Sequence, residues 1–215
     1  LSRREAQAMF DAARTHGVKL LEAYPYSFQP QVLAGLAELH AGAIGEVRGV
    51  QAHFGFTLNN PGQNIRTNPA LGGGALLDAG SYPLSLVRLA MACPPVRVQA
   101  HARWDASGVD IATTATLFYT DGRCAQIHCA MDAANHRHAT IMGSAGTIDT
   151  EYLNHTSGTA GSDPRGYLPS QWRVRRGTAN TVAFEDLPAR ATGSGFLFEA
   201  EAFVQSVIKD VIMHE

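Results

Sequence analysis

The sequence predicts an α+β fold, in which a large open β-sheet, mainly antiparallel or mixed, carries helices on one face. Apolar and polar residues alternate along several segments, most regularly from Val96 to Trp104, as expected of strands that bury one face. Short turns such as Thr120-Asp121-Gly122 separate successive segments, which favours an antiparallel meander. Apolar residues at helical spacing over 31–41 and 198–207 predict helices that cover the apolar face of this sheet.

The first residues predict the end of a different, parallel α/β domain. Ser2-Arg3-Arg4-Glu5 is a capping box, and apolar residues follow it at helical spacing as far as Ala13. Gly17 ends this helix, and residues 18–23 follow directly as a short buried strand. Because a helix that runs straight into a buried strand is half of an α/β crossover unit, we expect the partner strands of this segment before Leu1.

The rest of the chain supplies the open sheet. Pro25 and Pro30 mark a boundary, and the helix over 31–41 ends at Gly42. Residues 155–169 are rich in Gly, Ser, Thr and Pro and predict a surface loop. The strands are expected at residues 50–58, 96–104, 111–119, 124–131, 138–142 and 172–176.

Composition and charge exclude several classes of function. With 17 Lys and Arg against 19 Asp and Glu, the chain has a net charge of −2 and an isoelectric point near 6.5, so we expect no binding to nucleic acid. No apolar run approaches the roughly 20 residues that span a bilayer, so we expect no association with a membrane. Cys93, Cys124 and Cys129 form no C-x-x-C pair, which favours a reducing compartment, the cytoplasm.

The densest cluster of chemically useful residues lies between residues 64 and 83. Gly72, Gly73 and Gly74 lack a Cβ, so a ligand or another segment of backbone can approach them closely. Asp78 and Tyr82 stand four apart, which on a helix places their side chains together. An acid and a phenol beside a glycine-lined surface form a candidate proton-transfer pair.

Each of these residues also has a purely structural interpretation. The glycines can be a flexible connection, Asp78 can favour the positive end of a helix, and Tyr82 can be a core aromatic residue. The glycines form neither common phosphate cradle, since no Gly-Lys-Ser/Thr follows them and no strand runs into a G-x-G-x-x-G. His136 and His138 share a strand face, but without a third ligand we expect no metal site. The other histidines on polar strand faces meet either a subunit interface or water: His53, His101 and His128.

Three segments resemble a known family of oxidoreductases. They are Glu22-Ala23-Tyr24-Pro25-Tyr26-Ser27-Phe28-Gln29-Pro30-Gln31, Gly45-Glu46-Val47 and Gly72-Gly73-Gly74-Ala75-Leu76-Leu77-Asp78-Ala79-Gly80-Ser81-Tyr82-Pro83. The family is that of glucose–fructose oxidoreductase and inositol dehydrogenase (Gfo/Idh/MocA), and the branch resembled most is that of dimeric dihydrodiol dehydrogenase. Residues 143–148 and 199–203 also resemble landmarks of this family.

The resemblance implies a two-domain enzyme that transfers a hydride between NAD or NADP and a sugar-like or other alcohol or carbonyl substrate. It implies that residues 1–25 are the C-terminal remnant of a Rossmann dinucleotide-binding domain, which would hold most of the cofactor. Residues 26–215 would be the substrate-binding and dimerisation domain. Since the family's sheet commonly forms the subunit interface, the expected partners are a small-molecule substrate and further copies of the chain, in a homodimer or higher homo-oligomer.

The resemblance also assigns site residues. Tyr82 matches the family's acid/base position and Asp78 its accompanying aspartate. Arg66 is a candidate cation on the substrate side, with a solvated loop arginine as the alternative. Ser27 and Gln29 stand where relatives of this branch often have Arg and His, which puts that arginine's contact in doubt. The remaining residues expected on the substrate side are Tyr26, Gly73 and Gly74.

The family's catalytic lysine is expected upstream of Leu1, so we expect the isolated chain to be inactive. The alternative is a non-enzymatic binding or regulatory protein that reuses the same fold, because a fold does not determine a function.

Overall fold

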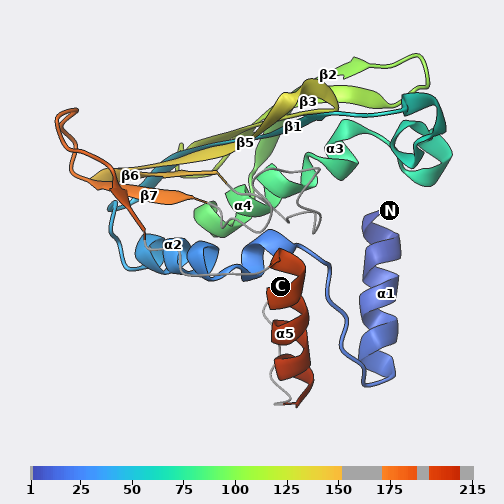
Figure 1. The fold of residues 1–215 in the computed structure, drawn as a ribbon, viewed down its shortest axis with the longest axis horizontal. Coiled ribbons are helices and arrows are strands. Elements are labelled where there is room, and N and C mark those ends of the chain that lie inside the picture. The colour runs from blue at the N-terminus through green and yellow to red at the C-terminus, as the bar shows by residue number, and fades with distance from the viewer. Residues whose placement is uncertain (1, 152–170, 188–193, 209–215) are drawn as a thin grey trace. The chain divides into compact units, whose positions relative to one another are not determined.

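The computed structural model describes residues 2–151, 171–187 and 194–208, so the loop expected over 155–169 lies outside the described residues. The described residues, drawn as a coloured ribbon in Figure 1, fall into two compact units. One contains residues 2–29 with 194–208, and the other contains residues 30–151 with 171–187.

The first unit is helical. Its capping box forms as expected, because the Ser2 hydroxyl accepts from the Glu5 backbone while the Glu5 carboxylate accepts from the Ser2 backbone. A short 3₁₀ turn packs against the last helix and buries Tyr26 completely. Burial raises the pKa of Glu199 on that helix, and a hydrogen bond from the Tyr24 backbone offsets part of this effect. The elements are α1 (Arg3–Thr15), η1 (Pro25–Phe28) and α5 (Gly195–Ile208).

The prediction of a strand at residues 18–23 was wrong. These residues form no regular secondary structure, and Val18 and Leu20 are 59% and 43% exposed rather than buried. A strand is stabilised only where a neighbouring backbone completes its hydrogen bonds, and residues 18–23 pair with none of the strands in the described sheet.

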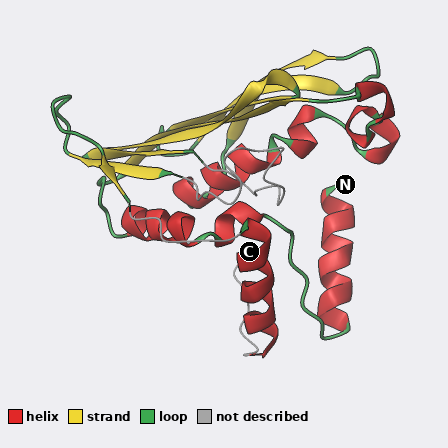
Figure 2. Cartoon of the chain, in the orientation of Figure 1, coloured by secondary structure: helices red, strands yellow, loops and turns green. Residues whose placement is uncertain are grey.

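The second unit contains one mixed sheet of eight strands, in the order β2-β3-β4-β1-β5-β6-β7-β8. Figure 2 draws strands in yellow. All neighbouring pairs are antiparallel except β1 and β4, which run parallel with Gly49 opposite Cys124. The α+β sheet predicted from the sequence is therefore confirmed. The strands are β1 (Val47–Thr57), β2 (Arg97–Trp104), β3 (Asp110–Phe118), β4 (Cys124–Ala130), β5 (Asp132–Gly143), β6 (Gly146–Thr150), β7 (Trp172–Arg176) and β8 (Glu185–Asp186).

Helices cover one face of this sheet, as Figure 1 shows. The helix expected to do so over 198–207 forms as α5, but it belongs to the first unit and packs against η1, so that expectation was wrong. Helix α2 packs against β7, α4 packs against β1 and β4, and α3 packs against β3. Phe54 of β1, Ile127 of β4 and Leu86 of α4 are all buried in the core between the sheet and the helices. The helical elements of this unit are α2 (Pro30–His40), η2 (Pro61–Gln63), η3 (Ile65–Thr67), η4 (Pro69–Leu71), α3 (Ala75–Asp78) and α4 (Ser81–Met91).

Strand β2 differs from its expected burial. The alternation from Val96 to Trp104 predicts one buried face, yet Val98 and Trp104 are 56% and 68% exposed. The reason is position: β2 is the edge strand, and no helix of the described residues covers its apolar side. None of the helices in the described part of the chain has both the length and the apolar character needed to cross a bilayer.

Candidate functional site

The loop before the three glycines is an ordered chain of short turns. Residues 61–71 form η2, η3 and η4, and the side chains of Asn64 and Asn68 accept from the backbone two residues ahead of each. Gly72 ends η4 in the left-handed conformation, with φ of 73°. The loop is therefore held by its own backbone and is not simply a flexible connection.

Gly73 and Gly74 lie where other atoms occupy the space of a side chain. A Cβ built at Gly73 would lie 2.5 Å from the Arg66 carbonyl oxygen, and one at Gly74 would lie 2.2 Å from Oδ1 of Asp110. The Gly74 amide donates to the same Arg66 oxygen at 2.9 Å. These glycines thus serve the close approach of protein groups, and the Asp110 carboxylate beside Gly74 makes the run a poor cradle for a negatively charged dinucleotide.

The helix expected after the glycines is divided in two. Helix α3 ends at Asp78, and α4 begins at Ser81, while Ala79 and Gly80 between them keep right-handed helical angles. A Cβ at Gly80 would lie 2.9 Å from Sγ of Cys129 on β4. Gly80 therefore lets the junction between the two helices settle directly onto the sheet.

Asp78 forms an ion pair with Arg66. Arg66 Nε donates to Asp78 Oδ2 at 2.7 Å, and the two side chains are 38% and 33% exposed. The Arg66 guanidinium also lies 5.8 Å from the centre of the Phe56 ring. Arg66 is thus held at the site by two partners, although its exposure means that solvent screening weakens the ion pair.

Tyr82 lies half-buried against Phe54. The two rings stack with centres 4.6 Å apart and planes 17° from parallel. Phe54 is almost fully buried on β1, and the guanidinium of Arg137, its register partner on β5, lies 4.7 Å from the centre of its ring. Phe54 therefore orients the phenol and is itself contacted by Arg137, and the Tyr82 side chain is neither sealed in the core nor fully exposed.

The structure gathers most of the predicted site residues in one place. Asp78 and Arg66 pair directly, and Gly73 and Gly74 lie against the backbone carbonyl of Arg66. Tyr26 belongs to the other unit, where it is fully buried with its ring at 86° to that of Tyr24. Its role in substrate binding stays a prediction.

Sequence reasoning missed three residues that build this site: Phe54, Asp110 and Arg137. Each lies on a strand outside residues 64–83. Packing of α3 on β3 and of α4 on β1 brings Asp110 and Phe54 to the site, and the pairing of β1 with β5 adds Arg137. Asp110 accepts from the Leu76 amide at 2.8 Å and from the Thr113 hydroxyl at 2.7 Å.

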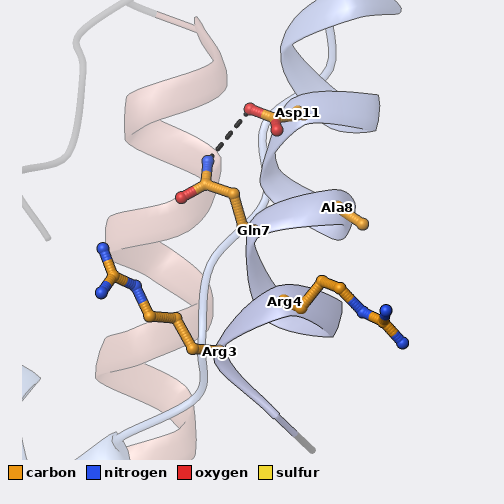
Figure 3. Close-up of a pocket in the computed structure, with 5 residues that line it drawn as sticks. All are labelled: Arg3, Arg4, Gln7, Ala8 and Asp11. Carbon is orange, nitrogen blue, oxygen red and sulfur yellow. Dashed lines mark hydrogen bonds between the residues drawn. The ribbon is translucent and has the colours of Figure 1, made fainter.

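A hollow lies along α1, lined by Arg3, Arg4, Gln7, Ala8 and Asp11 (Figure 3). A hydrogen bond of 3.0 Å joins Gln7 to Asp11 one turn further on. All of these residues lie on one helix that has no buried residue, so this hollow lacks the enclosed polar groups of a binding site.

The uncovered face of the sheet, which is the face that no helix of the described residues packs against, carries a cluster of four histidines: His53, His128, His136 and His138. The ring centres of His53 and His128 lie 6.2 Å apart, and those of His128 and His136 lie 6.0 Å apart. Burial lowers the pKa of His53 and of His128, and the neighbouring histidines lower both further. Within the described ranges, no three ligand-type side chains are placed to hold a metal ion.

The histidine cluster predicts a stability that depends on pH. Folding lowers the pKa of His53 below its unfolded value of 6.5. As the pH falls below 6.5, the unfolded chain therefore binds a proton that the native state does not, and the native state loses stability. We expect the urea midpoint to fall between pH 7.5 and pH 5, and to fall less in the His53→Gln variant. His101→Gln on β2 is the control, and an equal slope in all three proteins would contradict the prediction.

Comparison with known proteins places this fold. The sequence model of the GFO/IDH/MocA C-terminal domain matches residues 37–149, just over half of the chain. The chain belongs to this family. The resemblance drawn from the glycine segment is therefore confirmed.

Relatives in the Gfo/Idh/MocA family include two curated dehydrogenases. The chain is 36% identical to trans-1,2-dihydrobenzene-1,2-diol dehydrogenase of Danio rerio over 146 residues, 67% of this chain and 43% of the relative. It is 29% identical to D-xylose 1-dehydrogenase (NADP(+)) 2 of Haloferax volcanii over 159 residues, 74% of this chain and 49% of the relative. The chain thus spans about half the length of these curated relatives.

Solved structures of the Gfo/Idh/MocA fold agree. KijD10, a 3-ketoreductase from Actinomadura kijaniata solved with NADP and TDP-benzene, superposes with a TM-score of 0.79 at 26% identity, over 99% of this chain and 62% of that one. Aldose-aldose oxidoreductase from Caulobacter crescentus, complexed with glycerol, superposes with the same TM-score at 25% identity, over 95% of this chain and 58% of that one.

Proposed function

We propose that this chain is the substrate-binding and oligomerisation part of an NAD- or NADP-dependent oxidoreductase, which acts on a sugar-like or other alcohol or carbonyl substrate. Membership of a family whose relatives are named dehydrogenases and reductases supports the reaction class. The observation that carries the proposal is the half-buried Tyr82 phenol, which stacks on Phe54. Tyr82 comes four residues after Asp78, which forms an ion pair with Arg66.

This arrangement suits proton transfer at a substrate oxygen. Oxidation of an alcohol to a carbonyl removes a proton from the hydroxyl, and reduction returns it, so a side chain must exchange that proton. The Tyr82 hydroxyl does this in our proposal, while stacking on Phe54 restricts the orientation of the ring. The Arg66 guanidinium offsets the charge of Asp78, so the carboxylate does not oppose negative charge that develops on the phenol oxygen.

The nicotinamide cofactor needs residues other than those described. The glycine run is occupied by the Arg66 carbonyl and the Asp110 carboxylate, and among the described residues no strand runs into a glycine fingerprint and helix. In our proposal, the described residues therefore orient the substrate and exchange its proton, and another part of the protein holds NAD or NADP.

The isolated 215-residue chain is expected to show no turnover with NAD or NADP and a panel of sugars and polyols, followed at 340 nm. Joined to the nicotinamide-binding half of a Gfo/Idh/MocA relative, it is expected to reduce the cofactor. Turnover by the isolated chain would contradict the prediction that it is inactive. A joined protein that binds the cofactor and a sugar but never turns over would refute the oxidoreductase and favour the non-enzymatic alternative.

We also propose that the uncovered sheet face pairs with a second copy of the chain. Two arginines on this face already have carboxylate partners, since Arg103 pairs with Asp132 and Arg173 with Asp149, so a second copy can cover these two without burying an unpaired charge. A hollow at Gly49 offers a place for a protruding side chain, and it is lined by Arg48, Gln51, Cys124, Gln126 and Met142. A stable dimer needs about 800 Å² from each copy.

The exposed thiol of Cys124 reports on this pairing. Cys124 borders the hollow on the sheet face, while the exposed Cys93 lies just beyond α4. When the protein concentration is raised from below to above the dissociation constant of the dimer, the rate at which the Cys124 thiol reacts is expected to fall at least fivefold. The rate for Cys93 is expected to stay constant. Equal, concentration-independent rates, with a monomer in sedimentation at all concentrations, would contradict the homodimer.

A further inference from the structure

Helix α3 is too short to be stable alone. It spans four residues, and its N-cap residue is Gly74, which has no side chain to accept from the free amides of the first turn. Oδ2 of Asp110, the first residue of β3, accepts from the Leu76 amide at 2.8 Å. The carboxylate therefore supplies, from a distant strand, the cap that the local sequence lacks.

The capped first turn of α3 comes just before Asp78 and Tyr82 in the chain. Asp78 is the last residue of α3, and the backbone continues through Ala79 and Gly80, still at helical angles, into α4 and Tyr82. We propose that Asp110 is a positioning residue, which holds α3 in place and so sets the positions of Asp78 and Tyr82. This inference rests on the proposed function, because it assigns Asp110 a role in that site.

The chain contains its own reporter of this positioning. Cys129 on β4 is fully buried, and the Gly80 backbone between α3 and α4 lies against its Sγ. Burial raises the pKa of Cys129 to about 12, so the closed state reacts very slowly with thiol reagents. Opening of the α3–α4 junction uncovers this sulfur, and the labelling rate of Cys129 then measures the opening without any substrate.

The experiment uses the full 215-residue chain with the exposed Cys93 and Cys124 replaced by serine, and labels Cys129 with a disulfide reagent at pH 8. Asp110→Ala removes the cap and is expected to raise the labelling rate about tenfold, as the loss of a helix cap does. Asp110→Asn keeps an oxygen acceptor and is expected to stay within about threefold of the parent rate. Thr113→Val removes the other hydrogen bond to the same carboxylate and should also stay within about threefold.

Labelling in increasing urea separates local from global opening, because a local opening depends only weakly on urea. An unchanged rate in Asp110→Ala, a rate that follows global unfolding, or an equal rise in Asp110→Asn or Thr113→Val would overturn the proposal. In the joined protein, Asp110→Ala is expected to lower kcat at least tenfold, and Asp110→Asn to restore most of it. An unchanged kcat in Asp110→Ala would overturn the positioning role. An inactive parent joined protein would refute the proposed function but leave the labelling result intact.

Discussion

Replacement of Tyr82 by phenylalanine is expected to lower kcat of the joined, active protein by about a hundredfold to ten-thousandfold, the usual contribution of a positioned acid or base. The substitution removes one hydroxyl and keeps the ring that stacks on Phe54 at 4.6 Å, so the fold of α4 should not change. KM is expected to change much less than kcat, because the lost interaction acts on the proton that moves in the transition state.

Steady-state rates across a pH series measure this effect. Tyr119→Phe is the matched control, since Tyr119 follows β3, is 5% exposed and has a pKa raised by burial. The control should keep its kcat within about threefold of the parent protein. If Tyr82→Phe keeps its kcat as well, the phenol is not the acid/base group. If only KM rises, Tyr82 binds substrate without exchanging its proton.

Substitution of Gly35 by alanine is expected to cost about 3 kcal/mol of unfolding free energy. Gly35 lies on the buried side of α2, where a Cβ would lie 2.0 Å from Cε3 of Trp172. Trp172 is 1% exposed at the start of β7, so its ring has no free space into which it can move. Alanine favours the helix by about 1 kcal/mol, but this gain is smaller than the cost of the overlap.

Urea unfolding of the isolated chain measures this change in stability. Gly62→Ala is the control, because Gly62 is exposed in η2 and a Cβ there would meet no atom within 4 Å. The control is expected to change stability by less than about 0.5 kcal/mol. A Gly35→Ala protein as stable as the parent would mean that α2 does not pack on Trp172 as closely as the contact requires.

Local pattern was enough to predict most of the sheet. Alternation of apolar and polar residues follows from the pleat itself, so β1, β3, β4 and β7 lie close to their expected ranges. Burial was harder to predict, since the alternation of β2 is as regular as that of any buried strand while its position at the edge leaves Trp104 exposed. Residues 18–23 show the same limit, because an apolar segment becomes a strand only beside a partner strand.

The candidate site divides in the same way. Its part within residues 64–83 is visible in the sequence, because the glycines, Asp78 and Tyr82 are close along the chain. No local pattern in the sequence points to Asp110 or Arg137. Asp110 lies 34 residues after Leu76, to which it is hydrogen-bonded, and Arg137 lies beside Phe54 only through the register of β1 and β5. Even the role of Gly74 depended on a distant group, because the Asp110 carboxylate fills the space that a side chain there would need.

The central place of β1 has a consequence for the order in which the protein is made. Both neighbours of β1, β4 and β5, come much later in the chain. For example, the Gln51 side chain of β1 donates to Gln126 on β4, 75 residues further on. While the ribosome is still making the intervening residues, β1 has two unsatisfied edges and an apolar side without its final cover. Synthesis of this protein should therefore pass through a stage that invites chaperone binding, which ends only when β4 and β5 have emerged and closed on β1.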